Sequence, residues 1–322
     1  MQTYKKDSSP LAEPYNNYHP SSNLEDFMSL KNTHHVTWLW LLVTLLISAS
    51  AMAEDLKPFV LGKTVSGEMS AAAAETKAAL EGQGFTIAGE YSPYPDAHVI
   101  VVTSDELKAT AGKTEHGGFG AAERVSLTKA GDSIQIAYVN PAYMAAAFRM
   151  DGNLAGVSKK LAAALGAQES FGAKKGLSEN KLRKYHYMIA MPYFDDVDEL
   201  ASFDSYAAAV DHIEKRLAAG TAGATQVYRI DIPGKEETLF GVAISTGDGA
   251  DKSVMSITDT GELKHTAHLP YELLVTGNEA IALAGKFRIA VSFPDLGMGT
   301  FMKISSAPGA ISDVLSAVAG GN

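Results

Sequence analysis

Two histidines and two methionines in the last quarter of the chain have the side chains that a soft metal or a haem iron would need. His265 and His268 lie three positions apart, and Met298 and Met302 lie four apart. Imidazole and thioether groups are ligands of copper and of haem iron. The same spacings are also typical of a surface histidine pair and of two methionines packed on one helix face. No motif indicates one particular cofactor, so the cofactor stays unknown.

A second group of residues would suit a small-molecule site. His116 precedes the glycine-rich residues 117–120, and glycines allow the backbone to approach a ligand closely. A plain flexible connection would have the same composition. Three tyrosines would either line an apolar cleft or pack in a core, namely Tyr91, Tyr94 and Tyr138.

Two arginines complete the candidate ligand-binding set. Arg149 and Arg288 each follow a phenylalanine, Phe148 and Phe287, and we expect them at comparable places in two similar halves of the chain. Each would hold an anion or pair with a carboxylate across the interface between the halves, and we favour the ion pair.

The sequence motifs of common enzyme classes are absent. A phosphate-binding loop needs a glycine five positions before Gly-Lys-Thr. Gly112-Lys113-Thr114 has Leu107 there, and Gly62-Lys63-Thr64 has Lys57. The chain contains neither H-E-x-x-H nor G-x-S-x-G. Catalytic residues therefore stay unknown, and we expect a protein that is not an enzyme, with an enzyme of unrecognised class as an alternative.

Composition limits the remaining possibilities. The 322 residues are 46% hydrophobic, which suffices for one large or two ordinary domains. A formal charge of -10 argues against a nucleic-acid partner, which requires a basic surface. The absence of cysteine excludes disulfides, thiolate zinc sites and a thiol nucleophile.

The N-terminal region predicts export. Residues 36–51 form an apolar run that is short for a membrane span and is followed by Ala51-Met52-Ala53, a typical cleavage sequence. We expect a signal peptide over 28–53, cleaved after Ala53, with an uncleaved anchor as the alternative. Residues 1–27 are polar and predict a disordered or mis-annotated extension. The mature protein would be periplasmic or secreted, with no stable membrane span.

The best-defined local pattern lies in the first half. Residues 125–138 predict a hairpin of two apolar runs around the turn Lys129-Ala130-Gly131-Asp132. Asn140-Pro141 ends the second run, and helical patterns follow. We expect a first α+β domain over 54–166.

A looser version of the same order predicts a second domain. Residues 167–184 are polar and basic and are typical of a linker, and 185–322 would form the second α+β domain. We expect its first strand at 185–191 and the second strand of its hairpin within 286–297. The longer spacing before the final proline predicts an insertion near 280–284.

These features resemble one known family. The first half has a helix that ends at Gly84-Phe85, a late hairpin, Asn140-Pro141 after it and a closing amphipathic helix. In these respects residues 71–166 resemble the bacterial family called domain of unknown function 302. The resemblance implies a small α+β fold and no agreed activity.

The second half matches that family less closely. Leu269-Pro270 precedes its predicted hairpin and Pro294 follows it, whereas the first half has Ala122-Glu123 where a Leu-Pro would fall. Neither half has the cysteine that some family members have after that proline, which weakens an inherited metal or redox role.

We therefore expect two similar small α+β domains, each a mainly antiparallel sheet with helices on one face. The leading functional hypothesis is a non-enzymatic binding or accessory protein whose site lies between the domains. Its partner would be a small molecule or another periplasmic protein. The main alternative is a metal- or haem-associated redox accessory protein.

Overall fold

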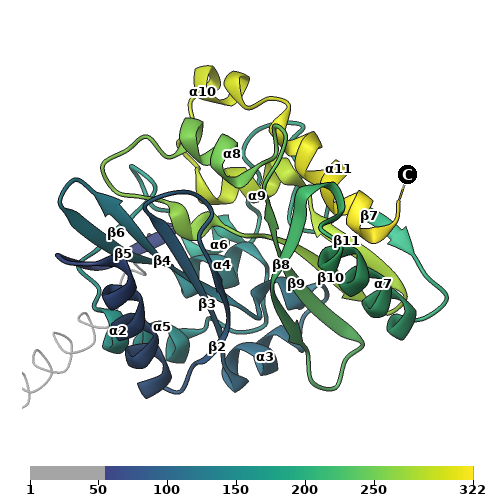
Figure 1. Cartoon of the computed structure of the whole chain (residues 1–322), viewed down its shortest axis with the longest axis horizontal. Coiled ribbons are helices and arrows are strands. Elements are labelled where there is room, and N and C mark those ends of the chain that lie inside the picture. Colours follow the sequence, from purple (N-terminus) through teal and green to yellow (C-terminus); the bar gives the residue numbers. More distant parts are fainter. Residues whose placement is uncertain (1–54, 322) are drawn as a thin grey trace, which may run out of the picture. The chain divides into compact units, whose positions relative to one another are not determined.

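Two antiparallel sheets form the centre of the computed structural model, which describes residues 55–321. The expected signal peptide and N-terminal extension lie outside the described residues. The first sheet has the order β2-β3-β4-β5-β1-β6 and the second has the order β7-β11-β10-β9-β8. Figure 1 shows the two sheets and the helices around them.

The strands of the first sheet are β1 Phe59–Val65, β2 Thr86–Tyr91, β3 Ala97–Thr103, β4 Glu123–Ala130, β5 Ser133–Val139 and β6 Glu169–Phe171. Those of the second are β7 Val197–Ser202, β8 Ala224–Asp231, β9 Glu237–Ile244, β10 Tyr271–Thr276 and β11 Glu279–Leu283.

The α-helices are α2 Met69–Gly82, α3 Asp105–Ala111, α4 Pro141–Ala147, α5 Ala155–Leu165, α6 Glu179–Leu182, α7 Tyr206–Ala218, α8 Asp251–Thr258, α9 Gly285–Ser292, α10 Met298–Lys303 and α11 Ala307–Ala319. Three 3₁₀ turns are η1 Gly117–Gly120, η2 Thr221–Gly223 and η3 Thr266–His268. Among the helices of residues 55–321, none combines the length and apolar character that a bilayer-spanning segment needs.

The two halves have the same topology. In the first copy (β1 to β6), the chain runs from β1 through α2, β2 and β3 to the hairpin β4–β5. In the second copy (β7 to α11), it runs from β7 through α7, β8 and β9 to the hairpin β10–β11. The sheet orders β2-β3-β4-β5-β1 and β8-β9-β10-β11-β7 correspond strand for strand. The prediction of two similar α+β domains is therefore confirmed.

The predicted first hairpin and the helix after it are also confirmed. Ala130 pairs with Ser133 around a turn in which Gly131 has a φ of 60°, a conformation that glycine adopts without strain. The side chain of Asn140 then accepts a hydrogen bond from the backbone N–H of Ala142, and Pro141 occupies the first turn of α4. This cap ends the strand and starts the helix, as the sequence predicts.

The hairpin of the second copy lies elsewhere than expected. Its second strand is β11, so residues 280–284 are a core element and the predicted insertion is wrong. Residues within 286–297 form the helix α9. Every residue of α9 except Lys286 is buried, and a helix that is buried on all sides loses the polar face that would reveal its period.

The expected first strand at 185–191 is also wrong, because the first strand of the second copy is β7. Residues 185–191 instead form turns whose tyrosines hold the segment in place. Tyr185 donates a hydrogen bond to the carbonyl of Ala290, and Tyr187 donates one to the carbonyl of Leu296. The expected linker 167–184 contributes β6 to the first sheet and contains α6.

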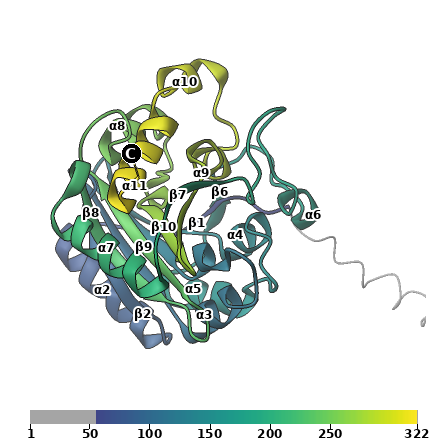
Figure 2. The ribbon, with the colours of Figure 1, turned by 90° about the vertical axis from the view of Figure 1, so that its right-hand side faces the viewer.

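In each copy, helices pack on one face of the sheet. The other copy lies near the opposite face. Along β10, Leu273 and Val275 pack in the core that contains residues of α7 and α11, whereas Leu274 packs in the core of the first copy. Successive strand residues point to opposite faces, so this alternation divides β10 between two cores. Figure 2 shows α2 and α7 on the same flank.

The copies contact each other through equivalent 3₁₀ turns. η1 of the first copy contacts β9 and β10, and η3 of the second copy contacts β3, β4 and β5. Residues 117–120, three glycines and Phe119, are all buried, so this stretch is part of the interface and not a mobile loop. His116 precedes η1 in a left-handed conformation and is partly buried.

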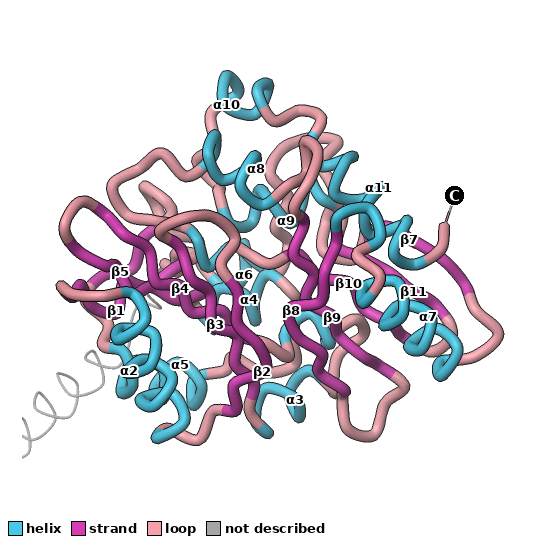
Figure 3. Tube along the Cα trace, in the orientation of Figure 1, coloured by secondary structure: helices cyan, strands magenta, loops and turns pink. Residues whose placement is uncertain are grey.

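The edge strands β2 and β8 also contact each other, and Figure 3 shows them next to one another. Gly89 of β2 lies so close to β8 that a Cβ atom at this position would meet the carbonyl oxygen of Val227. The close approach of the two copies therefore depends on the absence of a side chain at Gly89.

We predict that Gly89→Ala destabilises the fold by about 1–3 kcal/mol, because the added methyl group would push β2 and β8 apart. The matched control is Gly82→Ala at the end of α2, where a Cβ atom meets nothing within 4 Å. Urea unfolding of both variants measures the effect. Equal midpoints for Gly89→Ala and the unsubstituted protein would contradict the prediction.

Candidate functional site

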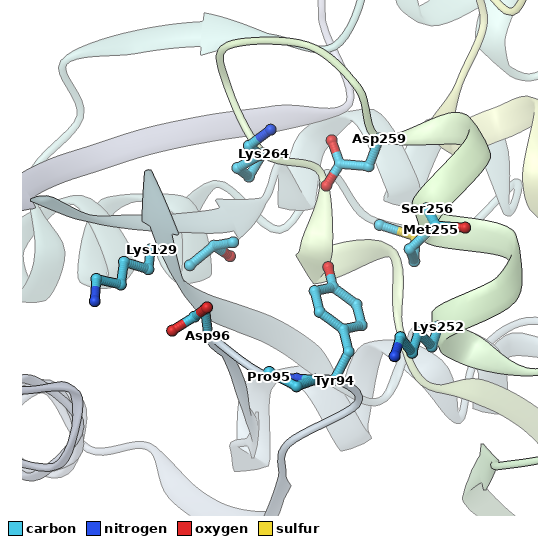
Figure 4. A pocket seen from close by; sticks show the side chains of 10 residues that line it. Tyr94, Pro95, Asp96, Lys129, Lys252, Met255, Ser256, Asp259 and Lys264 are labelled. Carbon is cyan, nitrogen blue, oxygen red and sulfur yellow. The ribbon is translucent and has the colours of Figure 1, made fainter. Parts of the chain in front are cut away.

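A cleft of about 360 Å³ lies between the two copies. The first copy contributes Tyr94, Pro95, Asp96, Thr128 and Lys129. The second contributes Lys252, Met255, Ser256, Asp259 and Lys264. Figure 4 shows these side chains around the cavity, with the ring of Tyr94 in its wall.

The first-copy wall is formed by the connection between β2 and β3 and by the end of β4. Tyr94 lies between two prolines, and the Asp96 backbone has a φ of 65°. The Tyr94 hydroxyl lies 2.8 Å from Thr266 Oγ1, which also accepts a hydrogen bond from Thr128 Oγ1. This chain of hydroxyls joins both copies below the cleft and fixes the orientation of the tyrosine ring.

Most of the second-copy wall is one face of α8 together with Asp259, the residue that caps its C-terminal end. Lys252, Met255, Ser256 and Asp259 follow the spacing i, i+3, i+4 and i+7, which places them along one side of a helix. Val254 and Met255 are buried in the core of the second copy. The α8 helix is therefore anchored by its apolar side chains while its mixed face borders the cleft.

Both ends of α8 are anchored by carboxylates. At its start, Asp251 Oδ2 accepts a hydrogen bond of 2.9 Å from the hydroxyl of Tyr91 in the first copy. Just beyond its end, both oxygens of Asp259 lie 3.0 Å from the His265 backbone nitrogen, which donates to them. Asp259 Oδ1 also lies 3.0 Å from His265 Nδ1. The Tyr91 bond fixes the cleft wall relative to the first copy, and the His265 bonds fix the end of α8 within the second copy.

A fully buried charge network lies elsewhere in the same interface. Arg124 of β4 donates hydrogen bonds to Glu272 of β10 and to the carbonyl of Ala267. Glu272 also accepts from Arg288 Nε at 3.1 Å and from the Tyr228 hydroxyl at 3.2 Å. One carboxylate of the second copy thus joins an arginine from each copy.

His268 is part of this network. Arg288 Nη1 lies 2.9 Å from His268 Nδ1, and His268 Nε2 lies 3.4 Å from the hydroxyl of Tyr271. Burial, with the positive charge of Arg288 as a smaller cause, lowers the pKa of His268 well below its usual value. The imidazole is therefore neutral and can accept from the guanidinium.

Two buried carboxyls have pKa values near neutrality. Burial raises the pKa of Glu123 to about 8, although the charge of Arg124 opposes the shift. Burial raises the pKa of Asp251 to about 7, although the hydrogen bond from Tyr91 opposes it. Glu123 Oε2 and Asp251 Oδ1 have no hydrogen-bond partner within the part of the chain that the structure describes. Each carboxyl is therefore more stable in its protonated form than an exposed carboxyl would be.

The predicted tyrosines have different environments. Tyr91 does not line the cleft, but it anchors α8 through Asp251. Tyr138 is buried and donates a hydrogen bond of 3.1 Å to the carbonyl of Gly166. Of the three tyrosines that the sequence indicates, the cleft contains Tyr94.

The two arginines lie on or just after the helix that follows the hairpin of their copy, but they differ in burial. Arg288 lies within α9 and is buried, whereas Arg149 follows α4 and is about one third exposed. Arg149 pairs with Asp195 at 2.7 Å and donates to the carbonyl of Arg183. Both arginines bind carboxylates, and the Glu272 that Arg288 binds also pairs across the copies with Arg124.

The four predicted metal ligands lie in different environments. His268 is bonded at both nitrogens, and the His265 ring packs between Phe59 and Phe293 while Nδ1 contacts Asp259. Met298 and Met302 lie on α10 and are more than half exposed. Residues 55–321 hold no group of three or more His, Cys, Asp or Glu side chains arranged for a metal ion. The metal or haem role stays an untested hypothesis.

Lys252, Met255 and Ser256 carry no motif that marks them as binding residues. Their helical spacing is the available signal, but a mixed polar and apolar helix face is typical of ordinary surface positions. Their role becomes visible only when the fold places α8 opposite Tyr94. No family model, no curated protein and no solved structure matches this chain.

We predict that Asp251→Asn reduces the pH dependence of stability. The pKa of Asp251 rises from 3.8 to about 7 on folding, so the folded state retains this proton as the pH rises between these values. The free energy of unfolding must then fall with pH over that window, by up to about 1.4 kcal/mol per pH unit from this group. Asparagine has no proton to lose, so the variant should show a shallower slope in urea unfolding between pH 5 and 7.

Asp211→Asn is the control for the loss of a carboxylate, because Asp211 is exposed on α7. We expect this variant to keep the slope of the unsubstituted protein. An Asp251→Asn slope equal to that of the control would show that Asp251 does not retain its proton on folding.

Proposed function

We propose that this chain is an exported, non-enzymatic protein that binds a small molecule in the cleft between its two copies. The cleft itself is the observation that supports the proposal, because residues from both copies form its walls. Binding sites lie preferentially at domain interfaces, and about 360 Å³ falls at the small end of their usual range of about 300–1,000 Å³.

The lining has the composition of a binding site. Tyr94, Pro95 and Met255 provide an apolar surface, and lysines and hydroxyl groups lie around it. A mainly apolar wall with a few placed polar groups is typical of small-molecule sites, in which the apolar contacts provide affinity and the polar groups provide orientation. The anchored ends of α8 favour a pocket that is formed before the ligand arrives.

The positions of the shifted carboxyls favour binding over catalysis. A general acid or base must lie within hydrogen-bond reach of its substrate. Glu123 is buried away from the cleft, and Asp251 is buried behind it. Asp259 does line the cleft, but its oxygens are occupied by His265. The enzyme and redox hypotheses therefore stay alternatives with less support.

Export is part of the proposal and rests on sequence. The apolar residues 36–51, the Ala51-Met52-Ala53 sequence and the lack of cysteine favour a periplasmic or secreted protein. We likewise propose that the fold shared by the two copies is similar to that of domain of unknown function 302. The alternative to a small-molecule ligand is a partner that is itself an exported protein.

We predict that Ser256→Trp blocks ligand binding. Ser256 is exposed on α8 and lines the cleft, so an indole at this position would fill the cavity without removing a core contact. Ser253→Trp is the matched control, because Ser253 is exposed on the same helix but does not line the cleft.

Native mass spectrometry of residues 54–322 recovered from producing cells tests this prediction. We expect a stoichiometric extra mass on the unsubstituted protein and on Ser253→Trp, and a bare polypeptide mass for Ser256→Trp. A bare mass for the unsubstituted protein, or an extra mass that Ser256→Trp retains, would contradict the proposal.

A further inference from the structure

We infer that the ligand of the inter-copy cleft is a small organic anion with a flat apolar body, and that Lys252 binds its anionic group. This inference rests on the proposed function, because it assigns a ligand class to the same cleft. The charge around the cleft, the direction of each lysine and the shape of the apolar wall support it.

The net charge of the cleft lining is positive, whereas the net charge of the whole chain is negative. The whole chain has a formal charge of -10, yet three lysines and two aspartates line the cleft. Asp259 is largely buried and accepts hydrogen bonds from the His265 backbone, so its charge is already stabilised by the protein. A lysine-rich cleft on an acidic chain would concentrate anions and repel cations.

The three lysines are not equivalent. Lys264 Nζ donates a hydrogen bond of 2.7 Å to the carbonyl of Gly261, and Lys129 extends away from Tyr94 in Figure 4. Lys252 extends from α8 toward Tyr94, and its side chain is exposed to solvent. Its ammonium group is therefore available for a ligand and is directed to the apolar wall of the cleft.

The position of Lys252 at the start of its helix also favours the binding of an anion. Lys252 is the second residue of α8, where the unpaired N–H groups of a helix carry a partial positive charge. The preceding Asp251 would oppose an anion if it were ionised. Burial raises the pKa of Asp251 to about 7, so this opposition is weak at mildly acidic pH. Anion binding should therefore be stronger at pH 6 than at pH 8.

The apolar wall indicates the shape of the ligand body. The Tyr94 ring is held by its hydroxyl contact to Thr266, with Pro95 beside it and Met255 across the cleft. An aromatic ring packs well against a fixed tyrosine face and a flexible thioether. The volume of about 360 Å³ fits a ligand of one or two rings better than a long acyl chain.

Three probes with one ring system and different charges test the inference, namely 2-naphthoate, 2-naphthylmethanol and 2-naphthylmethylammonium. Isothermal titration calorimetry of residues 54–322 at pH 6 measures their affinities. We expect 2-naphthoate to bind at least about tenfold more tightly than the other two, since one charge-assisted hydrogen bond contributes at least this factor.

Two lysine variants locate the anionic group. Lys252→Met should weaken 2-naphthoate binding by about tenfold or more and leave 2-naphthylmethanol unaffected. Lys264→Met is the matched control, and we expect a change of less than about threefold because Lys264 already donates to Gly261. Lys252 is exposed, so its replacement should not affect folding.

The possible results separate the two proposals. Equal binding of the three probes, or a Lys252→Met variant with full affinity for 2-naphthoate, would overturn the anion inference. If Ser256→Trp still abolished binding in that case, the cleft would remain the site. Probe binding that Ser256→Trp leaves unchanged would overturn the proposed function as well. A failure of 2-naphthoate to bind would overturn the inference, and the native mass of the recovered protein would then decide the proposed function by itself.

Discussion

The buried contact between Arg124 and Glu272 is the interaction on which the arrangement of the two copies depends. Each side chain is almost fully buried, and each belongs to a different copy. Removal of one charge would leave the other without compensation in a site that water does not reach, at a cost of about 3–5 kcal/mol. Arg288 adds a second cation to the same carboxylate. The two copies therefore cannot separate without exposing or stranding buried charge.

The cleft depends on this interface. Arg124 and Thr128 lie four residues apart on the same face of β4, so the strand that binds Glu272 also binds Thr266 below the cleft. Thr266 in turn holds Tyr94. The charge network, the hydroxyl chain and the cleft wall are thus successive parts of one contact surface, and a shift of one copy against the other would change all three.

Local sequence signals predict only part of this structure. The turn at Gly131 and the cap at Asn140 are short-range features, and both were predictable because neighbouring residues determine them. The sequence of α9 predicts a strand, because burial on all sides removes the polar face that would indicate a helix. Arg124 and Thr128 of β4 are polar residues that would normally face water, and here they bond to Glu272 and Thr266 of the second copy. The candidate cleft joins Tyr94 to α8, more than 150 positions away, a contact that no local pattern indicates.

A double-mutant cycle on Arg124 and Glu272 is the most direct test of the claim that this buried contact joins the copies. The free energy of unfolding would be measured in urea for Arg124→Met, Glu272→Met and the double variant. We expect each single variant to lose about 3–5 kcal/mol and the double variant to lose about 1–3 kcal/mol less than their sum. Additive losses would show that the two residues act independently, and would contradict the central role of their contact.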